Sequence, residues 1–212
     1  GAAFMNNRRA CALMALTMVF LGACNDEGSG LEAPPPAPTP APTGSNAVVL
    51  QWNQILSDNV GAGTLYSFRQ YAMLHIAMFD AANSVKQQYR PYRLQVPGGS
   101  TASDEAAVAQ AARDVMVALF PAATASFDAA LSARLASLPQ AAASQGVDIG
   151  KQVAAAVLLW RTGDGSAGPD PAYTPPALPG LWQSAVPGQV AVGGRYVTTL
   201  PFALSSPTLF LP

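Results

Sequence analysis

The stretch YAMLHIAMFDAANS, residues 71–84, decides the fold, because its apolar side chains cover nearly every side of a helix. Two rows of apolar residues lie along this stretch at helical spacing and extend slightly past its ends. One row consists of Phe68, Ala72, Ile76 and Phe79, and the other of Tyr71, Leu74, Met78, Ala81 and Val85. A helix that is apolar all round is usually buried in the middle of a bundle. We therefore predict a helix from about Leu65 to Gln87 at the middle of an all-α protein.

Four further segments repeat the helical spacing, which predicts a bundle of about five helices. Asn46 is a suitable N-cap for the first of them, and Ser103 or Thr101 for the next. Pro121 and Gly163 are expected to end helices. No strand-like alternation rises above this pattern. The four predicted segments are 46–60, 103–120, 122–138 and 140–161.

The sequence changes character after Gly163, where prolines occur throughout and no helical row continues. Compact domains rarely carry so long an irregular segment unless it packs over something or serves a site. We therefore predict a long irregular Pro/Gly-rich C-terminal segment that packs over something or serves a site, and that carries large apolar side chains which would not favour water. These side chains are Tyr173, Leu181, Trp182, Phe202, Leu204 and Phe210.

The composition excludes one class of partner. The 212 residues are 50% hydrophobic and only 11% charged, with a net charge of −1. Nucleic-acid binding needs clustered Lys and Arg, whereas the only lysines are Lys86 and Lys151. We therefore expect no nucleic-acid partner.

Residues 1–24 have the layout of a secretory signal. Arg8 and Arg9 precede an apolar run that is too short to span a bilayer. The run ends in Leu-Gly-Ala-Cys, which resembles a bacterial lipobox, so we predict export and lipidation of Cys24. The alternative is an ordinary or uncleaved signal in which this cysteine is incidental.

Residues 25–46 are predicted to form a tether, because Pro, Ala and Thr dominate the part from 33 to 45. The folded part is then 47–212. Cys11 lies within the predicted signal and Cys24 at the predicted lipidation point, so the mature domain is expected to contain no disulfide.

Six motifs follow one another along the folded part: VVLQWNQI, QYAMLHIAMFDAANSV with YRPY, ASDEAAVAQAARDVMVALFP, VAAAVLLWRTGDGS, YTPPALPGLWQ and LPFALSSPTLF. In this order and spacing they resemble bacterial vanadium-dependent haloperoxidase-like proteins of the phosphatidic-acid-phosphatase-like superfamily. The resemblance implies an α-helical bundle that binds vanadate or phosphate. It also implies halide oxidation by peroxide in the haloperoxidases, and a nucleophilic histidine in the phosphatases.

The chain departs from this family in the catalytic motifs. A Lys-to-Arg-Pro, a Pro-Ser-Gly-His and an Arg-to-His segment belong to the family, and none occurs in these 212 residues. A multiply charged oxyanion needs several cationic and N–H donors. No catalytic, cofactor-binding or metal-binding residue is therefore carried over. Vanadate, the cofactor that the resemblance implies, is not expected to bind this chain alone. We interpret 47–212 as the N-terminal helical part of such a protein.

The polar residues of the 71–84 stretch are predicted to be structural. His75, the single histidine, is expected to be a core or interface residue hydrogen-bonded to a neighbour. Asp80 and Asn83 share a helix face and are expected to tie this helix to the next. Arg69 lies three turns from Asp80, too far for a direct ion pair.

Other polar and aromatic residues give weaker signals. The RTGDGS stretch, 161–166, follows a helix, so it is predicted to be a helix stop and a turn instead of a phosphate loop. Asp164 and Asp170 are poor candidates for calcium binding or acid–base chemistry. Trp160 and Trp182 are predicted to anchor the core.

Two functions remain open from the sequence. The chain is either the scaffold part of an exported haloperoxidase- or phosphatase-like enzyme, inactive without a catalytic C-terminal half, or a non-enzymatic helical surface lipoprotein that binds a partner. The expected partners are the membrane, through the lipid anchor at Cys24, and either the missing half or a second copy of the chain.

Overall fold

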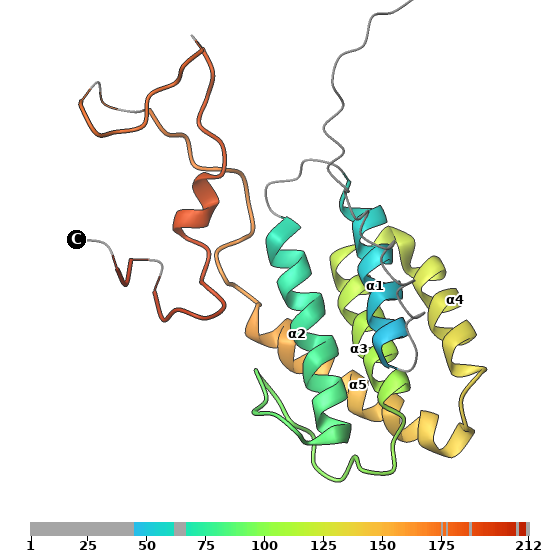
Figure 1. Cartoon of the computed structure of the whole chain (residues 1–212). Coiled ribbons are helices and arrows are strands. Elements are labelled where there is room, and N and C mark those ends of the chain that lie inside the picture. The colour runs from blue at the N-terminus through green and yellow to red at the C-terminus, as the bar shows by residue number, and fades with distance from the viewer. Residues whose placement is uncertain are drawn as a thin grey trace, which may run out of the picture. The chain divides into compact units, whose positions relative to one another are not determined.

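Helices make up the regular structure of the computed structural model, which describes residues 45–61, 67–174, 176, 178–186, 188–206 and 208–210 (Figure 1). No strand occurs in this described part, so the predicted all-α class is confirmed. The five α-helices are α1 (Ser45–Val60), α2 (Ser67–Lys86), α3 (Asp104–Leu119), α4 (Thr124–Leu135) and α5 (Gln140–Trp160). Two short 3-10 helices are η1 (Pro121–Ala123) and η2 (Gly194–Val197).

The middle of the bundle is occupied by α3, and the prediction that the 71–84 helix lies there is wrong. Helix α3 contacts each of the other four helices (Figure 1). On α2, Phe68 is 73% exposed, and Phe79 is exposed as well. The reason is side-chain size: alanines on α3 let four neighbours approach its backbone, whereas the aromatic side chains of α2 need more space than a central position leaves.

Helices α3 and α5 form the most extensive helix–helix contact, and two glycines make their close approach possible. A Cβ on Gly146 would lie 2.4 Å from the Ser103 carbonyl oxygen. A Cβ on Gly150 would lie 2.5 Å from the Ala107 carbonyl oxygen. These distances are well inside van der Waals contact, so glycine at both positions sets the spacing between the helices.

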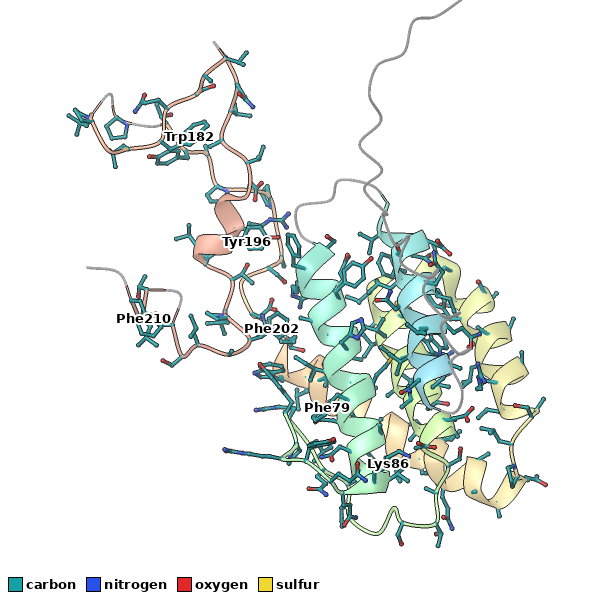
Figure 2. The ribbon with its side chains drawn as sticks, in the orientation of Figure 1. Phe79, Lys86, Trp182, Tyr196, Phe202 and Phe210 are labelled. Atoms are coloured by element: carbon teal, nitrogen blue, oxygen red, sulfur yellow. The ribbon has the colours of Figure 1, made fainter. Side chains whose placement is uncertain are left out.

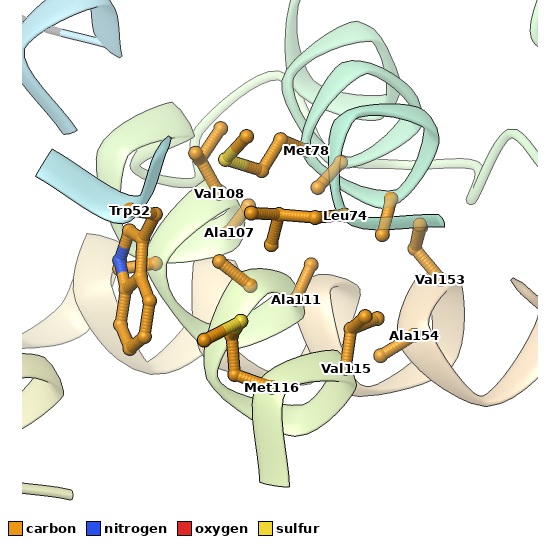
Figure 3. Packing of buried hydrophobic residues seen from close by; sticks show 14 of the residues in the cluster. Trp52, Leu74, Met78, Ala107, Val108, Ala111, Val115, Met116, Val153 and Ala154 are labelled. Atoms are coloured by element: carbon orange, nitrogen blue, oxygen red, sulfur yellow. The ribbon is translucent and has the colours of Figure 1, made fainter. Parts of the chain in front are cut away.

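The core consists of apolar side chains from the helices, with Val96 added from the connection after α2 (Figure 3). Trp52 of α1 and Phe127 of α4 are fully buried, and their ring centroids lie 6.4 Å apart. Leu74 and Met78 of α2 are buried in the same cluster. The predicted rows on α1, α3 and α5 supply much of this core, as the helical spacing requires.

Most helix boundaries agree with the predicted stops. The Ser103 side chain accepts a hydrogen bond from the Ala106 N–H at 3.2 Å, which confirms Ser103 as the N-cap of α3. Pro121 follows the end of α3 and opens η1, so α4 is shorter than its predicted range of 122–138. Helix α1 begins at Ser45, so Asn46 lies in its first turn instead of capping it.

The C-terminal segment after Gly163 is irregular, as predicted, apart from η2. Most of its large apolar side chains are exposed to solvent (Figure 2). Phe202 is partly buried against the core, but the other five are exposed: Tyr173, Leu181, Trp182, Leu204 and Phe210.

Candidate functional site

His75 lies on the surface of α2 and is bonded to α1. Its Nε2 atom is 3.0 Å from the Asn53 Oδ1 atom, and its ring stacks on that of Tyr71 with the centroids 6.5 Å apart. Burial lowers the pKa of the imidazole, which favours the neutral ring. The side chain remains exposed to solvent. His75 is therefore a helix-interface residue hydrogen-bonded to a neighbour, one of the two placements predicted for it.

Asp80 is fully buried and holds the chain that follows α2. Its carboxylate accepts backbone N–H bonds from Tyr92 at 2.7 Å, from Arg93 at 2.6 Å and from Leu94 at 2.9 Å. Three N–H donors to one carboxylate compensate for the loss of water around the charge. Asp80 therefore fixes the shape of the connection to α3.

Asn83 and Ser84 continue this attachment along the same helix. The Asn83 amide accepts from the Tyr89 N–H at 2.9 Å and donates to the Tyr89 carbonyl at 2.7 Å. The Ser84 hydroxyl accepts from the Val96 N–H at 2.9 Å. The predicted structural role of Asp80 and Asn83 is confirmed, but they tie α2 to the connection before α3, and not to α3 itself.

Two arginines converge on Asp164 at the end of α5, and we call these three residues the Arg–Asp cluster. Arg69 Nε lies 2.7 Å from Asp164 Oδ2, and Arg161 Nε lies 2.8 Å from the same oxygen. The Ser166 N–H and hydroxyl donate to Oδ1. Asp164 is 3% exposed, so this is a buried carboxylate with donors on both oxygens.

Arg161 also holds the C-terminal segment. Its guanidinium donates to the Leu200 carbonyl at 2.7 Å and to the Pro201 carbonyl at 3.3 Å. It also lies over two rings that contact each other, 5.0 Å from the Trp160 centroid and 4.0 Å from the Phe202 centroid. Planar guanidinium groups suit such a combination of stacking and fixed donors. Arg161 therefore connects the end of α5 to residues 200–202.

The electrostatics of the Arg–Asp cluster favour the ionised carboxylate. Burial of Asp164 alone would raise its pKa. The hydrogen bonds from Arg69 and Ser166 and the charge of Arg69 outweigh burial and lower the pKa to about 2. The carboxylate is thus charged at any ordinary pH, and it offsets part of the positive charge of the two guanidinium groups.

Sequence reasoning correctly predicted a stop and a turn at 161–166 but did not predict the Arg–Asp cluster. Helix α5 ends at Trp160, and Gly163 and Gly165 have φ values of 70° and 79°. Arg69 lies 95 residues from Asp164 in the sequence, so no local pattern links the two. One signal was present: an arginine directly after an apolar helix, three residues before an aspartate.

Asp170 closes a second loop and does not act with Asp164. It accepts from the Gly193 N–H at 3.0 Å and from Arg195 Nε at 3.2 Å. The little burial present would raise the pKa of Asp170, but these hydrogen bonds and the Arg195 charge lower it. The two aspartates flank the start of the C-terminal segment and share no arginine: Asp164 pairs with Arg69 and Arg161, and Asp170 with Arg195.

A cavity of about 700 Å³ lies within the C-terminal segment. Tyr173 and Trp182 line it, with ring centroids 6.4 Å apart. Trp182 is 48% exposed, so the prediction that it anchors the core is wrong. Trp160 is half-buried and packs with Tyr92 and Phe202, with centroids at 5.9 and 5.5 Å, but it is not part of the core cluster, so the prediction that it anchors the core is wrong as well.

The signal, the lipidation of Cys24 and the tether stay predictions. Cys11, Cys24 and most of the tether lie outside the described residues. In the part of the chain that is described, no three His, Cys, Asp or Glu side chains come together as a metal site would require. None of the helices described has both the length and the apolar character needed to cross a bilayer.

The fold and the polar clusters define an all-α bundle with an irregular extension held by buried ion pairs. No family model, no curated protein and no solved structure matches the chain. The haloperoxidase resemblance therefore stays a prediction.

Proposed function

We propose that this chain is the helical scaffold of an exported, lipid-anchored protein related to vanadium-dependent haloperoxidases and phosphatidic-acid phosphatases. Its oxyanion-holding groups would come from polypeptide outside the 212 residues. The order of the motifs along residues 48–212 supports the relationship. The main support for the scaffold role is the Arg–Asp cluster, because both of its guanidinium groups bind Asp164 and so help to position the C-terminal segment.

Vanadate does not fit the described residues. Arg69 and Arg161 direct their N–H groups at Asp164, and Arg161 also donates to two backbone carbonyls. The His75 Nε2 atom is bonded to Asn53. An oxyanion entering the Arg–Asp cluster would have to displace a buried carboxylate that already satisfies these donors. The donors serve the fold, and no catalytic step is assigned to them.

One observation favours a second function, a non-enzymatic surface lipoprotein that binds a partner. The segment from Pro171 to Phe210 exposes many apolar side chains, which a soluble surface rarely concentrates in one place. In the scaffold proposal the same surface would pack against the catalytic part of the enzyme.

The experiment that separates the two functions compares the chain alone with a product extended through the coding sequence that follows codon 212. The scaffold proposal predicts Ser-Gly-His and Arg-to-His segments in the extension, and dye bromination with peroxide and vanadate only when the extension is present. An extension without these segments favours the lipoprotein. Strong bromination or phosphate-ester hydrolysis by the chain alone contradicts the scaffold proposal.

The lipid anchor is tested by labelling cells with a fatty acid. Wild type and Cys11→Ser should incorporate the label, because Cys11 lies within the predicted signal, whereas Cys24→Ser should not. Equal labelling of wild type and Cys24→Ser would remove the anchor from the proposal.

A further inference from the structure

The loop from Asp170 to Arg195 is closed at its base by a set of hydrogen bonds. The Asp170 carboxylate accepts from the Gly193 and Arg195 backbone N–H groups at 3.0 and 3.3 Å, and from Arg195 Nε at 3.2 Å. Arg195 Nη1 also donates to the Ser166 carbonyl at 2.9 Å. The two ends of the loop are therefore held together by a charged pair and by backbone contacts.

Two glycines allow the base to close. Gly193 has a φ of 83°, a left-handed conformation that other residues adopt only with strain. A Cβ on Gly194 would lie 3.0 Å from the Pro171 Cγ atom. The two segments of chain that form the base of the loop therefore lie close together, and η2 begins at Gly194. Because its base is fixed by these contacts, the loop holds its two sides in fixed positions relative to each other.

The two sides of this loop, together with Val197 and Thr198 just beyond it, line the partly open cavity of about 700 Å³, a volume in the range of roughly 300–1,000 Å³ typical of small-molecule sites. Apolar side chains dominate the lining, and the large ones are Tyr173, Trp182, Val190, Val192 and Val197. Gln189 and Thr198 supply side-chain hydrogen-bonding groups. Figure 2 shows Trp182 within the loop and Tyr196 on η2 at its base.

We propose that this cavity binds an uncharged aromatic small molecule. Among the described residues that line it, none carries a charged side chain, so a charged ligand would lose water without gaining a partner. The tilted Tyr173 and Trp182 rings, with centroids 6.4 Å apart, offer the edge and face contacts that an aromatic ring prefers. Gln189 and Thr198 would orient one polar substituent. This inference rests on the cavity and does not depend on the scaffold proposal.

The test uses the full chain and N-phenyl-1-naphthylamine, an uncharged aromatic probe whose emission rises in apolar surroundings. Of the three tryptophans, Trp52 is buried in the core and Trp160 is stacked at the end of α5, so Trp182 is the one that lines the cavity. We expect saturable binding of one probe per chain, together with quenching of tryptophan emission. Trp182→Phe should keep probe binding but lose most of the quenching.

A matched pair of variants distinguishes the cavity from general apolar surface. Val192 lines the cavity and is 67% exposed, whereas Val186 lies in the same loop, does not line it and is 57% exposed. Val192→Asp should weaken probe binding at least tenfold, and Val186→Asp should change it less than twofold. Circular dichroism should show an unchanged helical bundle in both variants, since neither residue belongs to a helix.

Four results would overturn the proposal. The first is no saturable binding to the wild-type chain. The second is an equal effect of Val192→Asp and Val186→Asp, which would indicate probe adsorbed on exposed apolar surface. The third is loss of probe binding as the chain self-associates in sedimentation experiments, which would show that a second copy covers the cavity. A carboxylate analogue of the probe should bind at least tenfold more weakly, and equal binding would contradict the chemical class assigned here.

Discussion

Replacing Asp164 by asparagine keeps the side-chain shape but removes the charge that the Arg–Asp cluster shares. The structure provides a magnitude for this change. The pKa of Asp164 lies at about 2 instead of its ordinary 3.8, and each pKa unit is worth about 1.36 kcal/mol. The folded state therefore gains roughly 2.5 kcal/mol at neutral pH from keeping this carboxylate ionised.

Asp164→Asn should cost more than this linkage alone, because it leaves the Arg69 and Arg161 guanidinium groups without their anion. Breaking a buried ion pair by removing one partner typically costs about 3–5 kcal/mol. Arg69 is partly exposed, which lets water screen its charge. We therefore expect a loss of about 3 kcal/mol in the free energy of unfolding measured by urea denaturation at pH 7.

The direction of the pKa shift of Asp164 determines how its contribution to stability depends on pH. A depressed carboxylate pKa contributes stability that is present above the unfolded value of about 3.8 and is lost as the pH falls through about 2. The stability difference between wild type and Asp164→Asn should therefore be constant from pH 7 to 5 and shrink between pH 4 and 2. Amide exchange at Leu200, whose N–H donates to the Asp164 carbonyl at 2.8 Å, should accelerate in the variant.

Asp148→Asn is the matched control, since Asp148 is an exposed aspartate on α5. Exposed substitutions of this kind stay within about 0.5 kcal/mol. If Asp164→Asn were no more destabilising than Asp148→Asn, or if its effect did not change between pH 4 and 2, the Arg–Asp cluster would not hold the C-terminal segment as described.

Three further changes test other parts of the structure. Gly150→Ala should lower the free energy of unfolding by about 1–2 kcal/mol, because its Cβ would lie 2.5 Å from the Ala107 carbonyl oxygen and overpack the α3–α5 contact. This cost exceeds the gain from the higher helix propensity of alanine. The control, Gln152→Ala on the exposed face of α5, should change the free energy of unfolding by less than about 0.5 kcal/mol. An NMR titration of His75 should give a midpoint below 6.5, and stability should fall as the pH drops from 6.5 toward that midpoint, because the unfolded chain binds the proton first. A midpoint at or above 6.5 would contradict the partial loss of water around the imidazole where α2 faces α1. Asp80→Asn should cost about 2–3 kcal/mol in urea denaturation, since an amide offers one acceptor oxygen to three backbone N–H donors, and a neutral result would show that these bonds do not hold the connection after α2.

Helical spacing predicted the five helices because each helix buries one row of its own apolar residues. The spacing of that row can be recognised from neighbouring residues in the sequence alone. It did not predict that α3 lies in the middle. The apolar count of the 71–84 stretch was higher, but the small side chains of α3 decide how closely neighbours can approach.

Among the polar clusters too, contacts between residues near in the sequence were predictable and contacts between distant residues were not. Asp80 and Asn83 act on chain that follows within 14 residues, so their structural role was accessible from the sequence. The pairing of Arg69 with Asp164 spans 95 residues and depends on where α2 and α5 meet, which no local pattern encodes. Trp182 looked like a core residue by its type, yet its position in a loop outside the bundle leaves it exposed.

A titration of the purified chain with orthovanadate, followed by 51V NMR and by the His75 imidazole resonances, tests the scaffold proposal without assuming any activity. If the arginines and the histidine serve the fold, the vanadate signal should show no saturable binding and the His75 resonances should not move. One vanadate bound per chain, with a shift of the His75 resonances, would show that these residues form an oxyanion site of their own.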